Sequence, residues 1–410
     1  LPKRSPIGGS SEIQLVHVLS RRRALFASIA AAIGIASNSS VMANDADGDR
    51  DDAVAFVKTN LDSNLSGIGA LDSNLTNAWG LAFAPGGAFW VSGNHSGTSN
   101  LINGDGSVAA LAITIPAPKS SSSGTISAPT GIISNSTGSF HVPGTALPAL
   151  FIFDTEDGTI AAWNSGVDLM HAVIVVDNSS SGANYKGLTF GSNASGNFIF
   201  ATNFRSGNVD VFDTNFAPVT TDGRFIDRHI PRGFAPFGIQ NIDGDLWVTY
   251  AKQDAQKDDD VAGPGNGFVD VFDTDGHLLR RFAERGSLNS PWGMARAPYG
   301  FGQFSGDILI GNQQDGHINA FDSHGNFVGS LRRPNGESIK IDKLWALQFG
   351  GGAKSSPESL FFTAGPNDEN NGLFGVINAV SATKDAAADK ASITGMRELR
   401  MPAAPLANHY

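Results

Sequence analysis

Short apolar runs separated by turn-forming residues recur along this chain. The clearest set lies at 290–294, 307–312, 316–322 and 327–331, with Gly, Asn, Asp and Ser between the runs. Runs of this length, bounded by such residues, are typical of β-strands joined by tight turns. The pattern therefore predicts a four-stranded antiparallel meander over 290–331.

A marker pair of residues, in most copies ending in glycine, opens each copy of this unit. The copies are Trp79-Gly80, Thr130-Gly131, Lys186-Gly187, Phe237-Gly238, Trp292-Gly293 and the degenerate Trp345-Ala346. Successive markers are 51 to 56 residues apart. A period of about 50 residues with four strands per unit is typical of propeller blades, which bury their faces by stacking into a ring. We predict an all-β, six-bladed β-propeller of four-stranded antiparallel blades.

The sixth blade has only three strands of its own. Its runs lie at 344–349, 359–364 and 373–380, and a spare apolar strand lies far away at 55–61. Adding that strand to the sixth blade would remove two exposed sheet edges. We therefore expect an N-terminal strand to close the ring.

The two ends of the chain lack the repeat. Within residues 1–43, three consecutive arginines at 21–23 precede a mild apolar stretch and small residues. This pattern indicates an export signal, of either the twin-arginine or the ordinary secretory type. We expect 44–53 to be an acidic linker, or a calcium loop because its aspartates alternate. The propeller is expected at 54–380 and a flexible tail at 381–410. This organisation predicts a periplasmic or extracellular protein.

Composition narrows the class of partner. Residues 1–43 hold five basic residues and one acidic residue, so their removal would change the net charge from −11 to −15. Such a surface repels nucleic acids and anionic membranes. The chain contains no cysteine, which excludes disulfides and thiol chemistry, and no apolar run is long enough to span a membrane. We expect a monomer whose partner is a small molecule, a glycan or another exported protein.

One face of the predicted propeller collects polar residues, because the turn after each second strand lies near the axis. Four of these residues are predicted as oxygen ligands of a divalent cation, with calcium the expected metal: Glu156, Asn203, Asn312 and Asp368. Asn and Asp are also common in turns for conformational reasons alone, and that alternative stays open. The histidines are dispersed without zinc-binding spacing.

The same face supplies candidate ligand-binding residues, namely Asn94, His95, Lys186, Arg205, Lys252 and Asp254. Lys186 stands at an inner position that is apolar in most copies of the repeat. It could hold an anionic group, pair with Asp157 or lie in a water-filled channel. The long fourth-blade loop at 252–266 could be a lid, a calcium loop or a solvated excursion.

Several stretches carry a resemblance to a known family. They include Ala235-Pro236-Phe237-Gly238-Ile239, Glu156-Asp157-Gly158-Thr159-Ile160 and Phe362-Thr363-Ala364-Gly365-Pro366. On these, residues 56–377 resemble a bacterial family of exported six-bladed propellers of unassigned function. The blades are more distantly similar to NHL-repeat and lactonase-type propellers, which hold a divalent ion through one Glu, two Asn and one Asp. That likeness is an analogy of fold.

Two functions follow as hypotheses. In the first, the protein binds a small molecule, glycan or protein through its polar funnel without catalysis. In the second, it is a metal-dependent hydrolase of lactonase type, or a lyase, using Glu156, Asn203, Asn312 and Asp368. The sequence contains no catalytic motif that decides between them.

Overall fold

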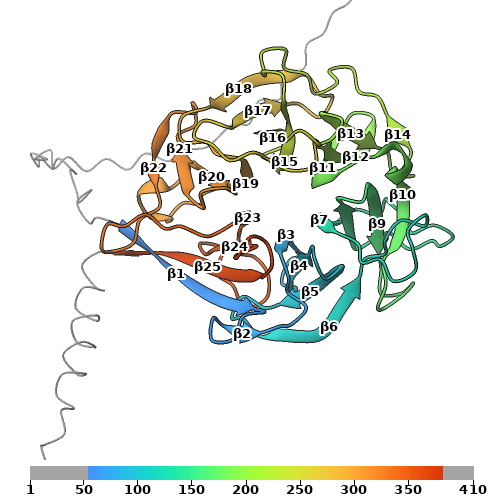
Figure 1. The fold of residues 1–410 in the computed structure, drawn as a ribbon, viewed down its shortest axis with the longest axis horizontal. Coiled ribbons are helices and arrows are strands. Elements are labelled where there is room, and N and C mark those ends of the chain that lie inside the picture. The colour runs from blue at the N-terminus through green and yellow to red at the C-terminus, as the bar shows by residue number, and fades with distance from the viewer. Residues whose placement is uncertain (1–53, 382–410) are drawn as a thin grey trace, which may run out of the picture. The chain divides into compact units, whose positions relative to one another are not determined.

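The computed structural model describes residues 54–381, so the predicted export signal, acidic linker and tail lie outside the described residues. Within this range six antiparallel sheets surround a common axis (Figure 1). The predicted six-bladed, all-β propeller is therefore confirmed. None of the helical segments within residues 54–381 has the length and hydropathy needed to span a membrane.

Each of the first three blades is a four-stranded meander in chain order. The strands of blade one are β3 (Ala78–Phe83), β4 (Phe89–Gly93), β5 (Thr98–Ile102) and β6 (Val108–Thr114). Those of blade two are β7 (Pro129–Ser134), β8 (Phe151–Thr155), β9 (Thr159–Trp163) and β10 (Val173–Asp177). Those of blade three are β11 (Tyr185–Asn193), β12 (Gly196–Asn203), β13 (Asn208–Phe212) and β14 (Pro218–Val219).

Blades four and five follow the same order, and blade six is assembled from both ends of the described chain. Blade four contains β15 (Phe234–Ile242), β16 (Asp245–Lys252), β17 (Phe268–Phe272) and β18 (Leu278–Glu284). Blade five contains β19 (Pro291–Arg296), β20 (Ile308–Asn312), β21 (Ile318–Phe321) and β22 (Phe327–Ser330). Blade six contains β23 (Leu344–Phe349), β24 (Leu360–Ala364) and β25 (Leu373–Ser381), followed by β1 (Val54–Ser63).

The N-terminal strand closes the ring as expected. β1 pairs antiparallel with β25 from the Val54–Ser381 pair to the Ser63–Leu373 pair. On β1, Phe56 is buried and its ring lies 5.0 Å from that of Phe301 in blade five. A short strand, β2 (Ala70–Leu71), extends this sheet in parallel with β1, which the sequence pattern did not predict.

The marker glycines exist because neighbouring inner strands run against them. A Cβ atom on Gly80 would lie 2.2 Å from the Thr130 carbonyl oxygen of the next blade. On Gly238 it would lie 2.3 Å from the Trp292 carbonyl oxygen. These distances are far below van der Waals contact, so the first strand of each of these blades needs glycine where it meets its neighbour.

Hydroxyl groups on the second strands tie adjacent blades together. Thr202 Oγ1 donates to the Phe237 carbonyl of the next blade at 2.7 Å, and Thr363 does the same to Trp79. Asp154 takes the corresponding position in blade two, where it is fully buried and accepts a hydrogen bond from Thr130 at 2.9 Å. Burial raises the pKa of Asp154 to about 7.

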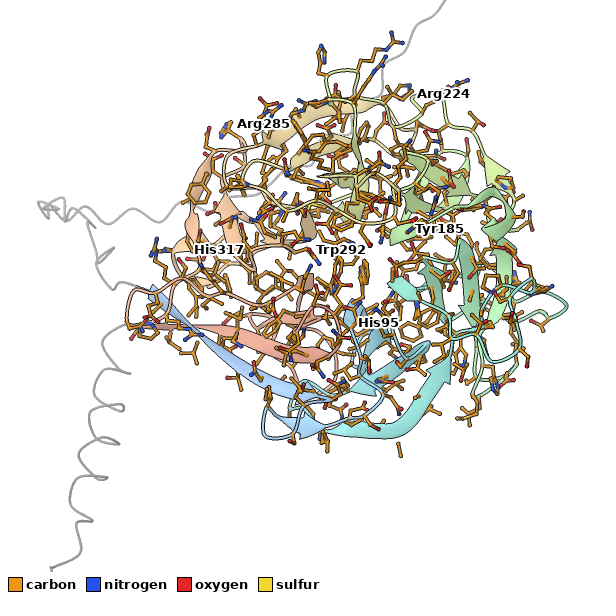
Figure 2. All side chains as sticks on the ribbon, in the orientation of Figure 1. His95, Tyr185, Arg224, Arg285, Trp292 and His317 are labelled. Carbon is orange, nitrogen blue, oxygen red and sulfur yellow. The ribbon has the colours of Figure 1, made fainter. Side chains whose placement is uncertain are left out.

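Aromatic side chains plug the axis of the ring. The residues that precede the marker glycines converge there, and Figure 2 places Trp292 where the innermost strands meet. Trp79 and Trp345 stack with ring centroids 3.4 Å apart, and Trp292 packs edge-on against both. Phe237 lies 5.9 Å from Trp345. This plug lies at the axis beneath the face on which the turns after the second strands gather, and we call that face the mouth.

Candidate functional site at the propeller mouth

Lys186 is the polar exception among the axial residues. It lies on β11 at the position that Trp79, Trp292 and Trp345 take in other blades. An irregularity in the pairing of β11 with β12, between Tyr185 and Gly187, falls at this residue. Its Nζ atom lies 5.4 Å from the centre of the Trp79 ring, and its side chain is only 2% exposed. The ammonium group therefore rests on the aromatic plug.

Two carboxylates neutralise the Lys186 ammonium group. Lys186 Nζ donates to Glu156 Oε1, and it lies 3.3 Å from Asp259 Oδ1. Burial by itself lowers the pKa of Lys186, but Glu156 and Asp259 outweigh it and the net pKa is raised. Lys186 thus does not pair with Asp157 or lie in a water-filled channel, because it is buried and Asp157 instead accepts from the Ala128 backbone at 2.8 Å.

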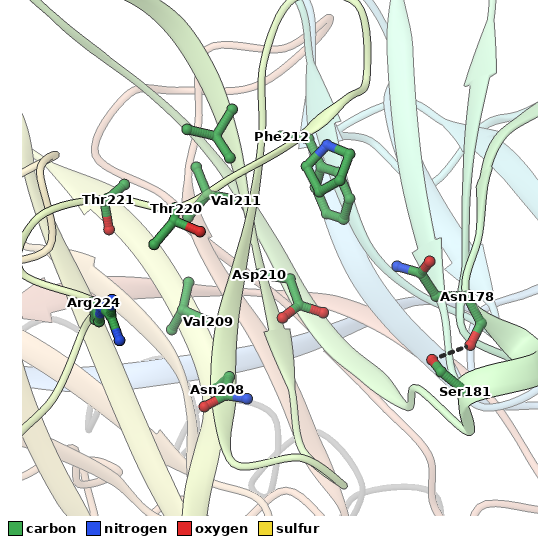
Figure 3. Close-up of a pocket in the computed structure, with 12 residues that line it drawn as sticks. Asn178, Ser181, Asn208, Val209, Asp210, Val211, Phe212, Thr220, Thr221 and Arg224 are labelled. Atoms are coloured by element: carbon green, nitrogen blue, oxygen red, sulfur yellow. Dashed lines mark hydrogen bonds between the residues drawn. The ribbon is translucent and has the colours of Figure 1, made fainter.

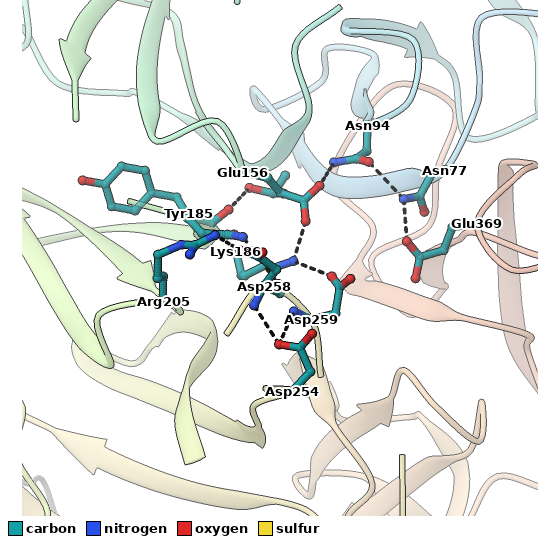
Figure 4. Close-up of polar contacts among 12 residues, drawn as sticks. Asn77, Asn94, Glu156, Tyr185, Lys186, Arg205, Asp254, Asp258, Asp259 and Glu369 are labelled. Carbon is teal, nitrogen blue, oxygen red and sulfur yellow. Dashed lines mark hydrogen bonds and ion pairs between the residues drawn. The ribbon is translucent and has the colours of Figure 1, made fainter. Parts of the chain in front are cut away.

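Lys186 belongs to a ring of polar side chains that passes through all six blades. Figure 4 shows the part of this ring that runs from Glu369 through Asn77, Asn94, Glu156 and Lys186 to Asp259. In blade one, Asn77 Nδ2 donates to Asn94 Oδ1 at 3.1 Å. Asn94 Nδ2 then donates to Glu156 Oε2 of blade two at 3.0 Å. Glu156 contacts Lys186 of blade three, which contacts Asp259 of blade four.

The second half of the ring returns to blade one through blades five and six. Asp260, next to Asp259, accepts from Gln314 Nε2 of blade five at 2.9 Å. The adjacent Gln313 donates through Nε2 to Glu369 Oε1 of blade six at 3.0 Å. Glu369 Oε2 accepts from Asn77 Nδ2 at 3.1 Å, which completes the circuit.

A strained turn presents Glu369 to the mouth. Asn367, Asp368 and Glu369 have φ angles of 59°, 55° and 66°, three consecutive non-glycine residues in the left-handed region. Each such residue costs roughly 1 kcal/mol, and strain of this kind concentrates at functional sites. The Glu369 side chain is 26% exposed. Desolvation raises the pKa of its carboxyl group to about 7; the nearby Lys343 lowers this pKa, and the nearby Glu156 raises it further. The mouth therefore holds a carboxyl group able to gain or lose a proton near neutral pH.

Two polar atoms near this ring have no hydrogen-bond partner among the described residues. Gln313 Oε1 is a buried acceptor, and Trp79 Nε1 is a buried donor. The rest of the Gln313 side chain is engaged with Glu369. Buried polar groups are normally hydrogen-bonded, so each of these atoms has one bonding position left unused by the described residues.

The fourth-blade loop folds over one side of the mouth. Besides the contact of Asp259 with Lys186, Asp258 pairs with Arg205 of blade three. Asp254 Oδ1 accepts from the Asp258 backbone amide at 2.9 Å and so shapes the loop tip. Gln253 Nε2 donates to the Phe204 carbonyl at 2.6 Å and fixes the loop base. The loop thus contributes carboxylates to the mouth.

The four predicted metal ligands have different surroundings. Glu156 is a member of the ring. The Asn203 amide is bound to Asp210 at 2.9 Å, and the Asn312 amide to the Ser287 carbonyl at 2.7 Å. Asp368 is 92% exposed. Within residues 54–381 no group of three or more His, Asp or Glu side chains is arranged to hold a metal ion. The calcium site stays a prediction.

The six predicted ligand-binding residues fall into two groups, four that take part in the contacts at the mouth and two that are exposed beside them. Asn94 and Lys186 belong to the ring, and Arg205 and Asp254 belong to the contacts that hold the loop beside it. His95 is exposed next to Asn94, and Lys252 is exposed at the base of the loop.

Sequence reasoning missed Asn77, Gln314 and Glu369 as site residues. Asn77 lies three residues before its marker glycine, and Ser290 and Lys343 occupy the same place in blades five and six. These three share φ angles near +50°, at 47°, 51° and 52°. An alignment of the repeats would have identified the position of Asn77. No local sequence pattern identifies Glu369, because the direction of its side chain depends on the left-handed turn.

Solved structures with the same fold have very different sequences. A protein of unknown function from Bacteroides thetaiotaomicron matches with a TM-score of 0.50 at 9% identity, over 80% of this chain and 76% of that one. Virginiamycin B lyase from Staphylococcus aureus matches with a TM-score of 0.47 at 12% identity, over 80% and 100%. A gluconolactonase from Xanthomonas campestris matches with a TM-score of 0.46 at 15% identity, over 75% and 87%. At these identities the likeness concerns the fold alone.

Sequence relatives include proteins of Acanthamoeba polyphaga mimivirus, and no family model matches the chain. Uncharacterized protein R648 of Acanthamoeba polyphaga mimivirus is 31% identical over 315 residues, covering 75% of this chain and 76% of its own length. Uncharacterized protein L690 of the same virus is 33% identical over 334 residues, covering 79% and 86%. The predicted bacterial family and the predicted export are not supported by these relatives and stay predictions. The chain belongs to the same family as the mimivirus proteins R648 and L690.

Proposed function

We propose that the mouth binds a small, neutral, polyhydroxylated molecule of the glycan class. The observation that carries this proposal is the turn at Asn367, Asp368 and Glu369, which is held in a strained conformation that places the Glu369 carboxyl group in the ring. A protein that maintains such strain at a partly exposed carboxyl group gains nothing in stability from the strain itself. The placement of Glu369 is best explained by a ligand.

The chemistry of the ring suits hydroxyl groups. The ring contains both amide and carboxyl side chains. Together they supply donors and acceptors, which is what a hydroxyl group, itself donor and acceptor, requires. Gln313 Oε1 is an unused acceptor and Trp79 Nε1 an unused donor among the described residues.

Charge and shape argue against other ligand classes. Glu156, Asp259, Asp260 and Glu369 outnumber the cations near them, so an anionic ligand would be repelled. The aromatic plug closes the axis below the ring, with Trp79 and Trp345 almost completely buried. The mouth therefore suits a small molecule or one end of a glycan better than a broad protein surface.

A divalent cation, calcium first, is the competing occupant, and with it goes metal-dependent hydrolysis. Glu156 and Glu369 supply oxygen atoms of the kind that calcium prefers. However, Glu156 already contacts the Lys186 ammonium group, and Asn94 turns its amide nitrogen toward Glu156. A metal at Glu156 would have to displace Lys186, so we rank this function second.

A glycan array probed with the purified, fluorescently labelled protein tests the proposal. We expect retention of defined glycans by the wild type, and its loss in Glu369→Gln and Asn94→Ala. The matched controls are Glu358→Gln and Asn326→Ala, which change exposed residues on turns at the opposite face. No retention, or retention that both mouth variants keep, would contradict the proposal. Retention lost on adding a calcium chelator would favour the metal-dependent alternative. Cleavage of a retained glycan by the wild type, but not by Glu369→Gln, would assign Glu369 to catalysis.

A further inference from the structure

The outer edge of blade three carries a groove separate from the mouth. Its volume is about 530 Å³. It lies between β13 and β14 on one side and the turn that carries Asn178 and Ser181 on the other (Figure 3). A volume of a few hundred Å³ is within the range of small-ligand sites.

Part of the β13 edge in this groove has no strand partner among the described residues. β13 pairs with β12 along its whole length, but β14 pairs only with Val211 and Phe212. On that edge the Asp213 amide donates to the Ala217 carbonyl at 2.9 Å. Residues two apart in a strand present their backbone groups to the same side, so the N–H and C=O of Val209 also face outward. On residues 208–210 the open backbone groups are therefore those of Val209, between Asn208 and Asp210, whose backbone groups face β12.

The edge of β13 stays open because the segment after β14 leaves blade three. After β14 the chain crosses to blade four, where the Gly223 amide donates to the Asp275 carbonyl at 2.9 Å. The Phe225 ring is buried between Phe200 and Phe272, with centroids 5.5 Å and 5.4 Å away. Arg224, held between these two anchors with a φ of 58°, is fixed beside the groove.

The groove has a charged group of each sign with unused bonding capacity. Asp210 Oδ2 accepts from Tyr185 at 3.0 Å and from Asn203 at 2.9 Å, while its Oδ1 has no partner within residues 54–381. The Arg224 guanidinium is exposed and makes no hydrogen bond or ion pair with the described part of the chain. The site thus offers one carboxylate oxygen and one free cation beside an open strand edge.

We propose that this groove binds a short peptide of about three residues with both termini free. Its backbone would extend the blade-three sheet by pairing with Val209, as added strands do at open sheet edges. Its terminal ammonium group would contact Asp210, and its terminal carboxylate would contact Arg224. The length follows from one peptide residue paired with Val209 and one terminal residue on either side of it, and the free termini follow from the Asp210 carboxylate and the Arg224 guanidinium.

Calorimetric titration of the full chain with trialanine tests this proposal, with trialanine amide and N-acetyl-trialanine as capped probes. We expect saturable binding of trialanine, weakened about five-fold or more by either cap. Arg224→Asn, chosen because Asn tolerates a positive φ, should weaken trialanine about as much and make it equal to the amide. Asp210→Asn should likewise make trialanine equal to the acetylated probe.

Arg228→Asn, at an exposed arginine outside the groove, is the matched control and should leave all three affinities unchanged. Thermal unfolding of each variant verifies that it folds. Absence of saturable binding to the wild type would overturn the proposal. Equal affinity for capped and free peptides, or an Arg224→Asn variant that still distinguishes trialanine from its amide, would overturn it as well.

Discussion

Asn77 Nδ2 lies 3.1 Å from Glu369 Oε2, which joins the first blade to the sixth across 292 residues of sequence. The same nitrogen lies 3.1 Å from Asn94 Oδ1. The Asn77 carbonyl oxygen atom, Oδ1, accepts from the Trp345 indole at 2.9 Å. One buried amide thus links the ring around the mouth to the aromatic plug beneath it, close to the place where β1 closes the propeller.

Glu369 should make the stability of the protein depend on pH. Its pKa is about 7 in the folded protein against 4.5 in the unfolded chain, so the folded state holds the proton longer. The stabilising contribution is therefore complete below pH 4.5 and is lost as the pH rises to 7. Relative to Glu369→Gln, the wild type should lose about 3 kcal/mol of unfolding free energy between pH 4 and pH 8. Urea unfolding of both proteins measures this, and parallel pH profiles would exclude the shift.

Asp154 should behave similarly for a different structural reason. It is a buried carboxyl group where blades three, four and six carry threonine, and its pKa is about 7. Raising the pH from 4 to 8 should cost about 3–4 kcal/mol, again because the folded state binds the proton more tightly. Asp154→Asn, which keeps the shape and an acceptor for Thr130, should be the more stable protein at pH 8. A variant that is less stable than the wild type at pH 8 would show that the carboxylate is tolerated.

The Lys186 ammonium group should be coupled to the carboxylate of Glu156. Lys186→Met keeps the length of the side chain but leaves Glu156 without its cation, which should cost about 3 kcal/mol. Glu156→Gln in the same chain should restore part of that loss, because no uncompensated charge remains. A double-mutant cycle by chemical denaturation measures the coupling. Additive effects of the two changes would contradict a direct pairing.

The marker glycines should differ in their tolerance of a methyl group. Gly238→Ala would bring a Cβ atom within 2.3 Å of the Trp292 carbonyl, so we expect a loss of more than about 3 kcal/mol or failure to fold. At Gly187 the nearest atom, the Phe237 carbonyl oxygen, would be 3.2 Å away. Gly187→Ala should therefore cost about 1 kcal/mol or less, and thermal unfolding compares the two. Equal losses of stability in the two variants would mean that close contact between neighbouring blades does not explain the glycine at the marker position.

The sequence predicts the fold because each blade repeats the same local pattern. The glycine marker, the turn residues and the spare strand at 55–61 determined the blade number and the closure by β1. The strand β2 was missed because a strand of two residues is too short to show an alternation of apolar and polar positions. The departure of the chain after β14, which opens the edge of β13, depends on where Phe225 packs and has no local signal.

The candidate site was predictable only in part. Glu156, Asn94 and Lys186 were found because turns after second strands and residues at marker positions can be aligned between blades. Their partners were not, because a side chain at the mouth can bond to several neighbours. Asn203 and Asn312 satisfy their own turns, whereas Glu369 reaches the ring through three left-handed residues that no sequence pattern indicates.

The central claim is that the mouth, with Glu369 in its ring, is the binding site for a hydroxylated ligand. Calorimetric titration of a glycan retained on the array tests it most directly, using the wild type, Glu369→Gln and the outer-groove variant Arg224→Asn. We predict that Glu369→Gln weakens binding at least about ten-fold, the loss expected for one or two hydrogen bonds to a charged group, and that Arg224→Asn leaves it unchanged. Equal affinities for the wild type and Glu369→Gln would contradict the account.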